Sequence, residues 1–136
     1  MSIVGFNFTT MHVEKKDVVK GKINISNNVS ITTVEKTDLA LGTAKQEGIK
    51  FTFEFVSRYE PEIGNIKIVG HVLLLDSKER TNDILSMWKK EKKVPQDVME
   101  NILNTVLSKC NIQALILSKE VNIPPPIMLP KVNVKK

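Results

Sequence analysis

The spacing of apolar residues changes once along this chain, close to residue 80, and the change restricts the folds that the chain can adopt. Before that point, apolar side chains recur at every second residue, as in strands with one buried face. After it, they recur at every third or fourth residue, as in amphipathic helices. Strands that precede helices, instead of alternating with them, are typical of an α+β fold with an antiparallel sheet.

A chain of 136 residues is long enough to bury one core. We therefore predict a single domain over residues 1–136, with an antiparallel sheet in 1–76, a helical region in 79–120 and a proline-containing C-terminal tail in 121–136. We expect a four-stranded antiparallel sheet followed by two helices, one short and one long, packed on one face of the sheet.

The strongest strand signal lies at residues 49–55, where one face carries Ile49, Phe51, Phe53 and Phe55. The intervening residues are polar, so these aromatic rings are expected in the core rather than on an exposed stacking platform. A turn over 60–65 leads to a further strand at 66–75, whose second face also becomes apolar toward its end. Part of that strand should be covered on both sides.

The first strand is predicted at residues 3–13, with apolar residues at Val4, Phe6 and Phe8 and then, out of phase, at Met11 and Val13. Successive side chains of a strand point to opposite faces, so this slip predicts a bulge near Thr9-Thr10 or a strong twist.

Residues 22–33 alternate around a polar pair, Asn27-Asn28. A tight turn and a polar interval within one long strand both fit this pair, and we favour the long strand. The composition of residues 42–48 predicts a loop.

Two helices follow. Thr81 and Asn82 are the expected caps of the first, in which Ile84, Leu85 and Trp88 form one stripe. The longer helix is expected to begin at Pro95, because proline is favoured in a first helical turn. Its apolar stripe widens after Cys110, so this helix should have more than one packing partner and self-association is expected.

No apolar run approaches the ~20 residues of a membrane span, and the amino terminus has no basic region followed by an apolar stretch. The lone cysteine, Cys110, cannot form an internal disulfide, which fits a reducing compartment. We therefore expect a cytoplasmic protein without membrane insertion.

The net charge of +5 makes nucleic acid a candidate partner, because a basic surface gains affinity by releasing counterions from phosphates. Nearly all of the positive charge is lysine, and only Arg58 and Arg80 offer bidentate forks. The densest basic run, residues 89–93, follows a helical pattern and fits a solvated helix end better than a nucleic-acid site.

The residues that catalysis requires are scarce. His12 and His71 lie in strand patterns without acidic or cysteine partners nearby in sequence, and Cys110 lies on an apolar stripe that favours a buried, inert thiol. Glu60 and Glu62 flank a proline in a turn, where solvated carboxylates are commoner than an acid/base pair. The sequence has no metal-ligand spacing and no glycine-rich phosphate loop. We predict no enzyme activity, no catalytic residue, no metal and no cofactor.

The order of elements and the ending resemble those of the SecB export-chaperone family. The local similarity lies in the strand pattern of residues 49–56, in the following strand at 66–75, and in residues 122–133, where a proline and a Leu-Pro pair precede the last segment. In architecture the resemblance covers most of the chain.

The resemblance implies an ATP-independent chaperone that holds unfolded or precursor polypeptides in long apolar grooves and assembles from dimers into a tetramer. In that family the grooves lie beside the sheet, bounded by the helical region and a crossover segment. Trp88 fits either a groove lining or the core of the domain. The client-binding candidates that the resemblance implies are Phe6, Phe8, Met87, Trp88, Ile127, Met128 and Leu129.

Two features depart from the family pattern. Residues 94–98 replace the aromatic-proline pattern that opens the long helix in the family, and a short lysine-containing link replaces the long crossover after the first strand. The sequence also has no obvious acidic tail-and-sheet surface for docking on the translocase motor, so we carry over client holding and not the export pathway. The alternative function is that of a basic accessory protein of a ribosome or other nucleic-acid complex, and an assembly or antitoxin-linked adaptor on the same scaffold fits the sequence equally.

The tail combines Pro124, Pro125 and Pro126 with apolar residues after them. We expect an extended polyproline conformation, which can be laid along a surface at low entropic cost. Docking on its own subunit or on a neighbour is favoured over direct contact with a client. Lys131, Lys135 and Lys136 should leave the end of the chain solvated.

Overall fold

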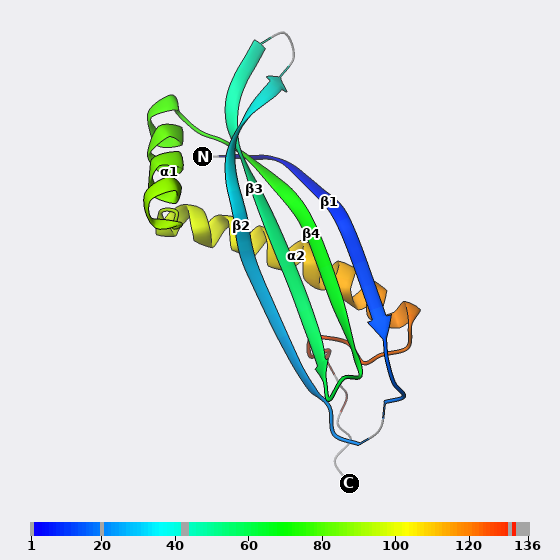
Figure 1. Cartoon of the computed structure of the whole chain (residues 1–136). Coiled ribbons are helices and arrows are strands. Elements are labelled where there is room, and N and C mark those ends of the chain that lie inside the picture. The colour runs from blue at the N-terminus through cyan, green and yellow to red at the C-terminus, as the bar shows by residue number, and fades with distance from the viewer. Residues whose placement is uncertain (1, 20, 42–43, 131, 133–136) are drawn as a thin grey trace.

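The computed structural model describes residues 2–19, 21–41, 44–130 and 132. It places a four-stranded antiparallel sheet before two helices, as predicted from the sequence (Figure 1). The elements are β1 (Ser2–Lys15), β2 (Asn24–Leu41), β3 (Ala44–Glu60), β4 (Gly64–Leu75), α1 (Lys78–Glu91) and α2 (Gln96–Glu120). The predicted solvated lysines Lys131, Lys135 and Lys136 lie outside the described residues.

The strands are ordered β1-β4-β3-β2, so β1 and β2 lie at opposite edges of the sheet (Figure 1). The link between them must therefore cross from one edge to the other. Its first residues pass the turn between β3 and β4, where the amides of Lys16 and Asp17 donate to the carbonyl of Ile63 at 2.7 and 3.3 Å.

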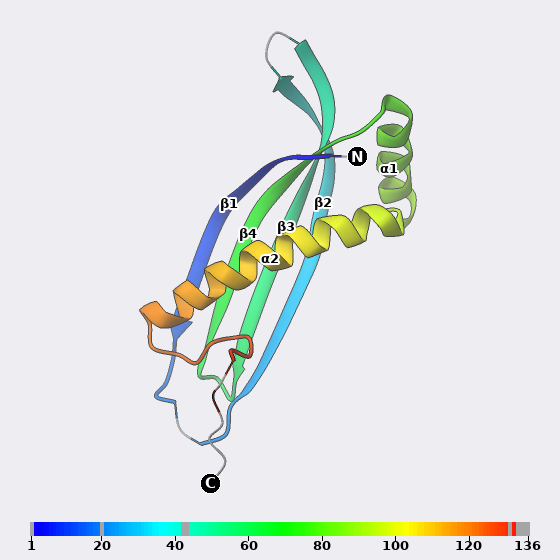
Figure 2. The ribbon, with the colours of Figure 1, turned by 180° about the vertical axis from the view of Figure 1, so that it is seen from behind.

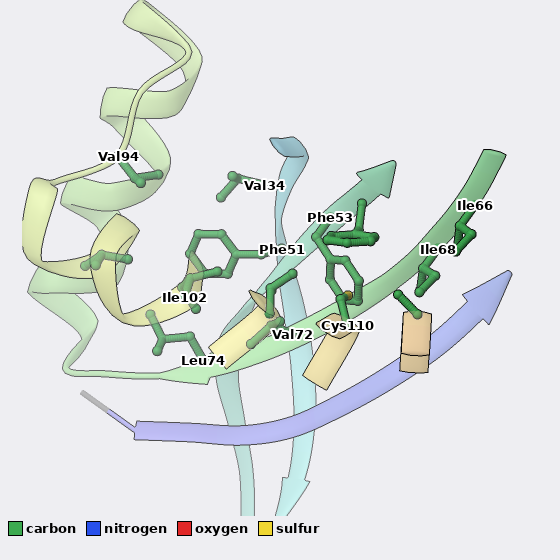
Figure 3. Packing of buried hydrophobic residues seen from close by; sticks show 14 of the residues in the cluster. Val34, Phe51, Phe53, Ile66, Ile68, Val72, Leu74, Val94, Ile102 and Cys110 are labelled. Atoms are coloured by element: carbon green, nitrogen blue, oxygen red, sulfur yellow. The ribbon is translucent and has the colours of Figure 1, made fainter. Parts of the chain in front are cut away.

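The core lies between the sheet and α2, which crosses one face of the sheet diagonally (Figure 2). We call this covered side the inner face. The apolar side of β3 is completely buried there, as its alternation predicts, and so are Ile66, Ile68, Val72 and Leu74 of β4. The buried residues of α2 recur at every fourth position: Val98, Ile102, Val106, Cys110, Ala114 and Ser118. Figure 3 shows Ile102 and Cys110 reaching from α2 onto side chains of β3 and β4 such as Phe51 and Phe53.

The predicted bulge in the first strand is confirmed, because the register of β1 against β4 shifts between Phe8 and Thr10. A second shift, between Ile3 and Gly5, was not predicted. It removes Val4 from the face that carries Phe6, and the Val4 side chain is 41% exposed. The prediction that Val4 shares the face of Phe6 and Phe8 is therefore wrong, because a bulged residue breaks the alternation on which it rested.

Asn27 and Asn28 lie inside one long strand, β2, as favoured from the sequence. The predicted loop over residues 42–48 is wrong in extent, because β3 begins at Ala44 and pairs with β2 from there. Residues 42 and 43 lie outside the described part of the chain. An ion pair of 3.0 Å between Lys36 and Glu47 joins the two polar strands of this hairpin, which projects past β1 and β4 (Figure 1).

Helix α1 begins at Lys78, one turn earlier than predicted. The cap is Ser77, whose hydroxyl accepts from the amide of Arg80 at 3.2 Å. Thr81, predicted as a cap, is instead a buried residue inside the helix. Arg80 also donates through Nη2 to both carboxylate oxygens of Asp97, each at 2.6 Å, and this pair ties the first turn of α1 to the first turn of α2.

Helix α2 begins at Gln96, one residue after the predicted start, and Pro95 is its N-cap. The helix ends in a hydrogen-bonded turn that sends the chain back over the sheet (Figure 2). Asn122 has a left-handed backbone, with φ of 58°. Its amide donates to the carbonyl of Lys119 at 3.3 Å, and the amide of Ile123 donates to that of Ser118 at 3.0 Å. This is the Schellman arrangement, in which the residue after the left-handed one is commonly apolar and packed. Ile123 is buried accordingly.

Within the described residues, neither helix combines the length and the apolar character that a membrane span requires.

Two isoleucines of α2 allow a direct test of this packing. Ile102 is fully buried against the sheet, whereas Ile112 is 61% exposed. Ile102→Ala should lower the free energy of unfolding by about 2–5 kcal/mol, because it leaves a cavity in the core. Ile112→Ala should lower it by less than about 1 kcal/mol. Urea titration followed by circular dichroism measures both, and equal losses would contradict the orientation of α2.

Candidate functional site

The seven site residues predicted from the sequence lie in three separate places. Phe6 and Phe8 belong to β1 at one edge of the sheet. Met87 and Trp88 belong to α1, which lies beyond β2 at the opposite edge (Figures 1 and 2). The remaining three, Ile127, Met128 and Leu129, follow α2 in the tail. The structure therefore does not gather the seven residues into one groove.

Phe6 and Phe8 are partly buried on the inner face of β1, opposite Val72 and Gly70 of β4. The Phe6 ring stacks on Phe53 with 5.2 Å between centroids, and the Phe8 ring meets Phe6 edge-on at 5.1 Å. The ammonium of Lys109 on α2 lies 5.3 Å from the Phe6 centroid, within the range of a cation–π contact.

Met11 extends this apolar surface along β1. It pairs with Ile68, so it lies on the inner face, yet its side chain is 40% exposed. Phe6, Phe8 and Met11 together form what we call the β1 shoulder. They remain partly accessible because α2 covers the central strands more completely than the edge.

A similar surface borders the other edge. Ile25, Val29 and Ile31 of β2 pair with Tyr59, Phe55 and Phe53, so they face the inner side, and each is only partly buried. We call these three residues the β2 shoulder. Within the described residues, β1 and β2 each pair with one neighbouring strand, so each shoulder adjoins a strand edge with unpaired backbone groups.

Met87 and Trp88 are half-buried on α1, and Trp88 packs against the core. Lys92, which adopts a left-handed backbone at the end of α1, places its ammonium 5.5 Å from the Trp88 ring. Lys89 and Lys90 occupy the last turn of α1 and are exposed. The basic run is thus a solvated helix end, as predicted.

The first part of the tail docks on the sheet of its own chain. The hydroxyl of Tyr59 donates to the carbonyl of Pro124 at 2.5 Å, and Nδ2 of Asn27 donates to the carbonyl of Pro126 at 2.8 Å. Ile123 and Pro126 are buried, so of the two docking sites favoured from the sequence, the own subunit or a neighbour, this part of the tail occupies the own subunit. Farther along, Ile127 is half-buried, Met128 is 96% exposed and Leu129 is exposed.

Sequence reasoning missed Asn27, Ser57 and Tyr59 as docking residues. The hydroxyl of Ser57 donates to Oδ1 of Asn27 at 2.5 Å, which directs the amide nitrogen toward the tail. A signal was present in the phase of β3. Ser57 and Tyr59 continue the buried row of Phe51, Phe53 and Phe55, and polar groups in a buried row require partners.

The groups with reactive potential are held in inert settings. Cys110 is fully buried, and burial raises the pKa of its thiol to about 12. His71 Nδ1 lies 3.2 Å from the Thr52 hydroxyl. The exposed ring of His12 lies 3.4 Å from the carboxylate of Glu14, so the prediction that His12 has no acidic partner nearby in sequence is wrong. Among the described residues, no three His, Cys, Asp or Glu side chains are grouped so that they could hold a metal ion.

Two open hollows flank α1. One, of about 470 Å³, is lined by Gln46, Glu47, Leu75, Asp76, Lys78 and Thr81. Glu47 already pairs with Lys36, and the Thr81 hydroxyl, which has no hydrogen-bond partner among the described residues, is buried from solvent. The other, of about 500 Å³, is lined by Lys92, Lys93, Val94, Gln96, Met99 and Glu100.

Comparisons of this chain with protein-family models, curated proteins and solved structures gave no match.

The burial of Cys110 predicts its reactivity. A thiol reagent attacks the thiolate, which is scarce when the pKa is about 12, and the folded chain also blocks access. In native buffer at pH 8, Cys110 should react at least about a hundredfold more slowly than in denaturant. Absorbance of the released thiol chromophore follows both reactions, and equal rates would contradict the burial.

Alkaline pH should destabilise the fold. Burial raises the pKa of Cys110 from 9.0 to about 12 and that of Tyr59 from 10.0 to about 12. The unfolded chain therefore loses these protons first, so stability is complete below pH 9 and falls as pH rises toward 12. Urea midpoints measured from pH 8 upward test this, and Cys110→Ala should flatten the first part of the decline.

Proposed function

We propose that the protein is an ATP-independent molecular chaperone of the SecB-like type, a holdase for extended apolar segments of unfolded or precursor proteins. The β1 shoulder supports this function most directly. It is an apolar surface of Phe6, Phe8 and Met11 that the domain leaves partly uncovered beside an open strand edge. The β2 shoulder offers the same combination at the opposite edge.

An extended polypeptide suits such a surface for two reasons. Its backbone can pair with the open edge of β1, which provides affinity that depends little on its sequence. Every second side chain can then rest on the shoulder, where burying a large apolar side chain yields roughly 1.5–3 kcal/mol. Clients of varied sequence would be held without a cofactor, and the chain has no glycine-rich phosphate loop for ATP.

The path of the chain also favours the SecB resemblance. That family carries a crossover between its first and second strands, and the strand order here requires one, since β1 and β2 lie at opposite edges. The crossover of this chain, over residues 16–23, is short, so it can cover less of the sheet. Client holding is proposed without the export pathway, because the sequence offers no acidic surface for docking on a translocase motor.

A homo-oligomer in the cytoplasm, either a dimer or a tetramer, forms part of this hypothesis. Ile112 and Ile116 are exposed on α2, on the side away from its buried row. Light scattering across a range of concentrations measures the particle mass, and a monomer at all concentrations would refute the assembly.

The exposed lysines at the end of α1, Lys89, Lys90, Lys92 and Lys93, favour a second candidate function, binding to RNA within a larger complex. Such binding would weaken steeply as salt is added, because each lysine releases counterions from phosphates. Salt titration of a fluorescent RNA tests it, and binding that is absent or indifferent to salt would exclude this candidate.

The chaperone activity is tested on a denatured client diluted with and without the protein, with aggregation followed by light scattering. Stoichiometric amounts should suppress aggregation, and no suppression at any excess would refute the function. Met11→Gln should require several-fold more protein, because it removes an accessible apolar contact worth about 1 kcal/mol. Val4→Gln, at a bulged residue of β1 that is 41% exposed and lies off the face of the shoulder, serves as the matched control and should act as the wild type does.

A further inference from the structure

Three residues of β2 and β3, Asn27, Ser57 and Tyr59, form what we call the tail-docking surface. This surface presents hydrogen-bond donors to a segment that has none of its own. Proline lacks a backbone N–H, so Pro124, Pro125 and Pro126 offer carbonyls only. Tyr59 and Asn27 supply donors to two of those carbonyls, at 2.5 and 2.8 Å.

One of the two donors is oriented by a residue outside the tail. Ser57, fully buried, donates to Oδ1 of Asn27, which leaves Nδ2 as the group that faces the tail. Tyr59 is 1% exposed, and burial raises the pKa of its phenol, so the hydroxyl keeps its proton at neutral pH. Both hydrogen bonds are made to backbone carbonyls of the tail, and neither involves a tail side chain. They are therefore compatible with any extended proline-containing segment.

The docked segment is held by few groups. Beyond the two carbonyl contacts, Ile123 and Pro126 are buried, whereas Met128 and Leu129 are exposed. The tail-docking surface also continues the β2 shoulder, since Ile25 and Asn27 face the same side of β2, two residues apart. A polypeptide lying along that shoulder would reach the place that the tail occupies.

We propose that the tail-docking surface is a binding site for extended, proline-containing apolar peptides supplied in trans, and that the chain's own tail is its exchangeable occupant. This inference rests on the proposed holdase function, which it deepens by assigning the tail as a competitor of the client. An own-chain segment acts at an effective concentration of order mM, so it excludes weak ligands and yields to tight ones.

The experiment uses the full chain and a fluorescent peptide that copies residues 122–130. Ile123→Asp should expel the tail, because it places a charge where a buried side chain packs. Fluorescence anisotropy should then show at least about tenfold tighter peptide binding than the wild type shows. Val132→Asp makes a comparable change at a tail residue that is 91% exposed, and it should leave the wild-type affinity unchanged.

A second substitution tests the site itself. Adding Tyr59→Phe to Ile123→Asp removes the donor to the Pro124 carbonyl and should weaken peptide binding about fivefold, as expected for one hydrogen bond. Circular dichroism tests whether each variant is folded. If Ile123→Asp does not fold, the milder substitution Ile123→Ser takes its place. A folded tail variant that binds no more peptide than the wild type, or one whose binding is indifferent to Tyr59→Phe, would overturn the inference.

Aggregation assays on the same variants separate this inference from the proposed function. If Ile123→Asp gains peptide binding while no variant suppresses aggregation, the peptide site stands and the holdase function falls. If the wild type suppresses aggregation while Ile123→Asp gains no peptide binding, the holdase function stands and the exchangeable tail falls.

Discussion

The contact between α2 and the sheet is the constraint on which the rest of this structure depends. The buried residues of α2 recur at every fourth position from Val98 to Ser118 and lie against the inner face of the sheet. A helix is about 10 Å wide, and neighbouring strands lie about 4.8 Å apart, so one helix can cover about two strands fully. The inner faces of β3 and β4 are buried as this width predicts, and the apolar residues of the two shoulders are left partly covered, although Val34 and Leu39 farther along β2 are buried. The two shoulders are therefore a geometric result of covering four strands with one diagonal helix.

Much of the fold could be predicted from the sequence, because the buried faces of β3, β4 and α2 carry regular apolar spacing. The errors arose where local interactions outweigh that spacing. The bulge at Val4 reverses the alternation within a few residues of the strand start. Residues 42–48 contain two glycines and three polar or charged residues in a row, a composition typical of a loop, yet β2 and β3 pair as far as Leu41 and Ala44 and the Lys36–Glu47 ion pair joins them. Ser77 caps α1 ahead of Thr81 and Asn82, two residues that are also suitable as caps, so cap preference alone does not fix where the helix begins.

The candidate site was less predictable, because it depends on the order of the strands in the sheet. The sequence identifies Phe6 and Phe8 only as apolar residues of a strand. They are accessible because β1 lies at an edge of the sheet. The contacts of the tail join residues separated by 99 positions in one case and 65 in the other. No local sequence pattern predicts such pairs. Ser57 and Tyr59, which continue the aromatic row of β3, indicate only that some hydrogen-bond partner must lie near them. The pairing of Tyr59 with Pro124 satisfies a phenol that would otherwise be buried without an acceptor.

The strand order has a consequence for how the chain reaches its native state. Hairpin contacts join β2 to β3 and β3 to β4 over short separations, whereas β1 pairs with β4 through partners as distant as Ser2 and Leu75. Closing that long loop carries an entropic cost that the local hairpins do not, so nucleation is favoured in β2, β3 and β4. During synthesis β1 leaves the ribosome before β4, the strand with which it pairs, so its native pairing forms late. Until β4 emerges, the segment containing Phe6 and Phe8 must remain unpaired.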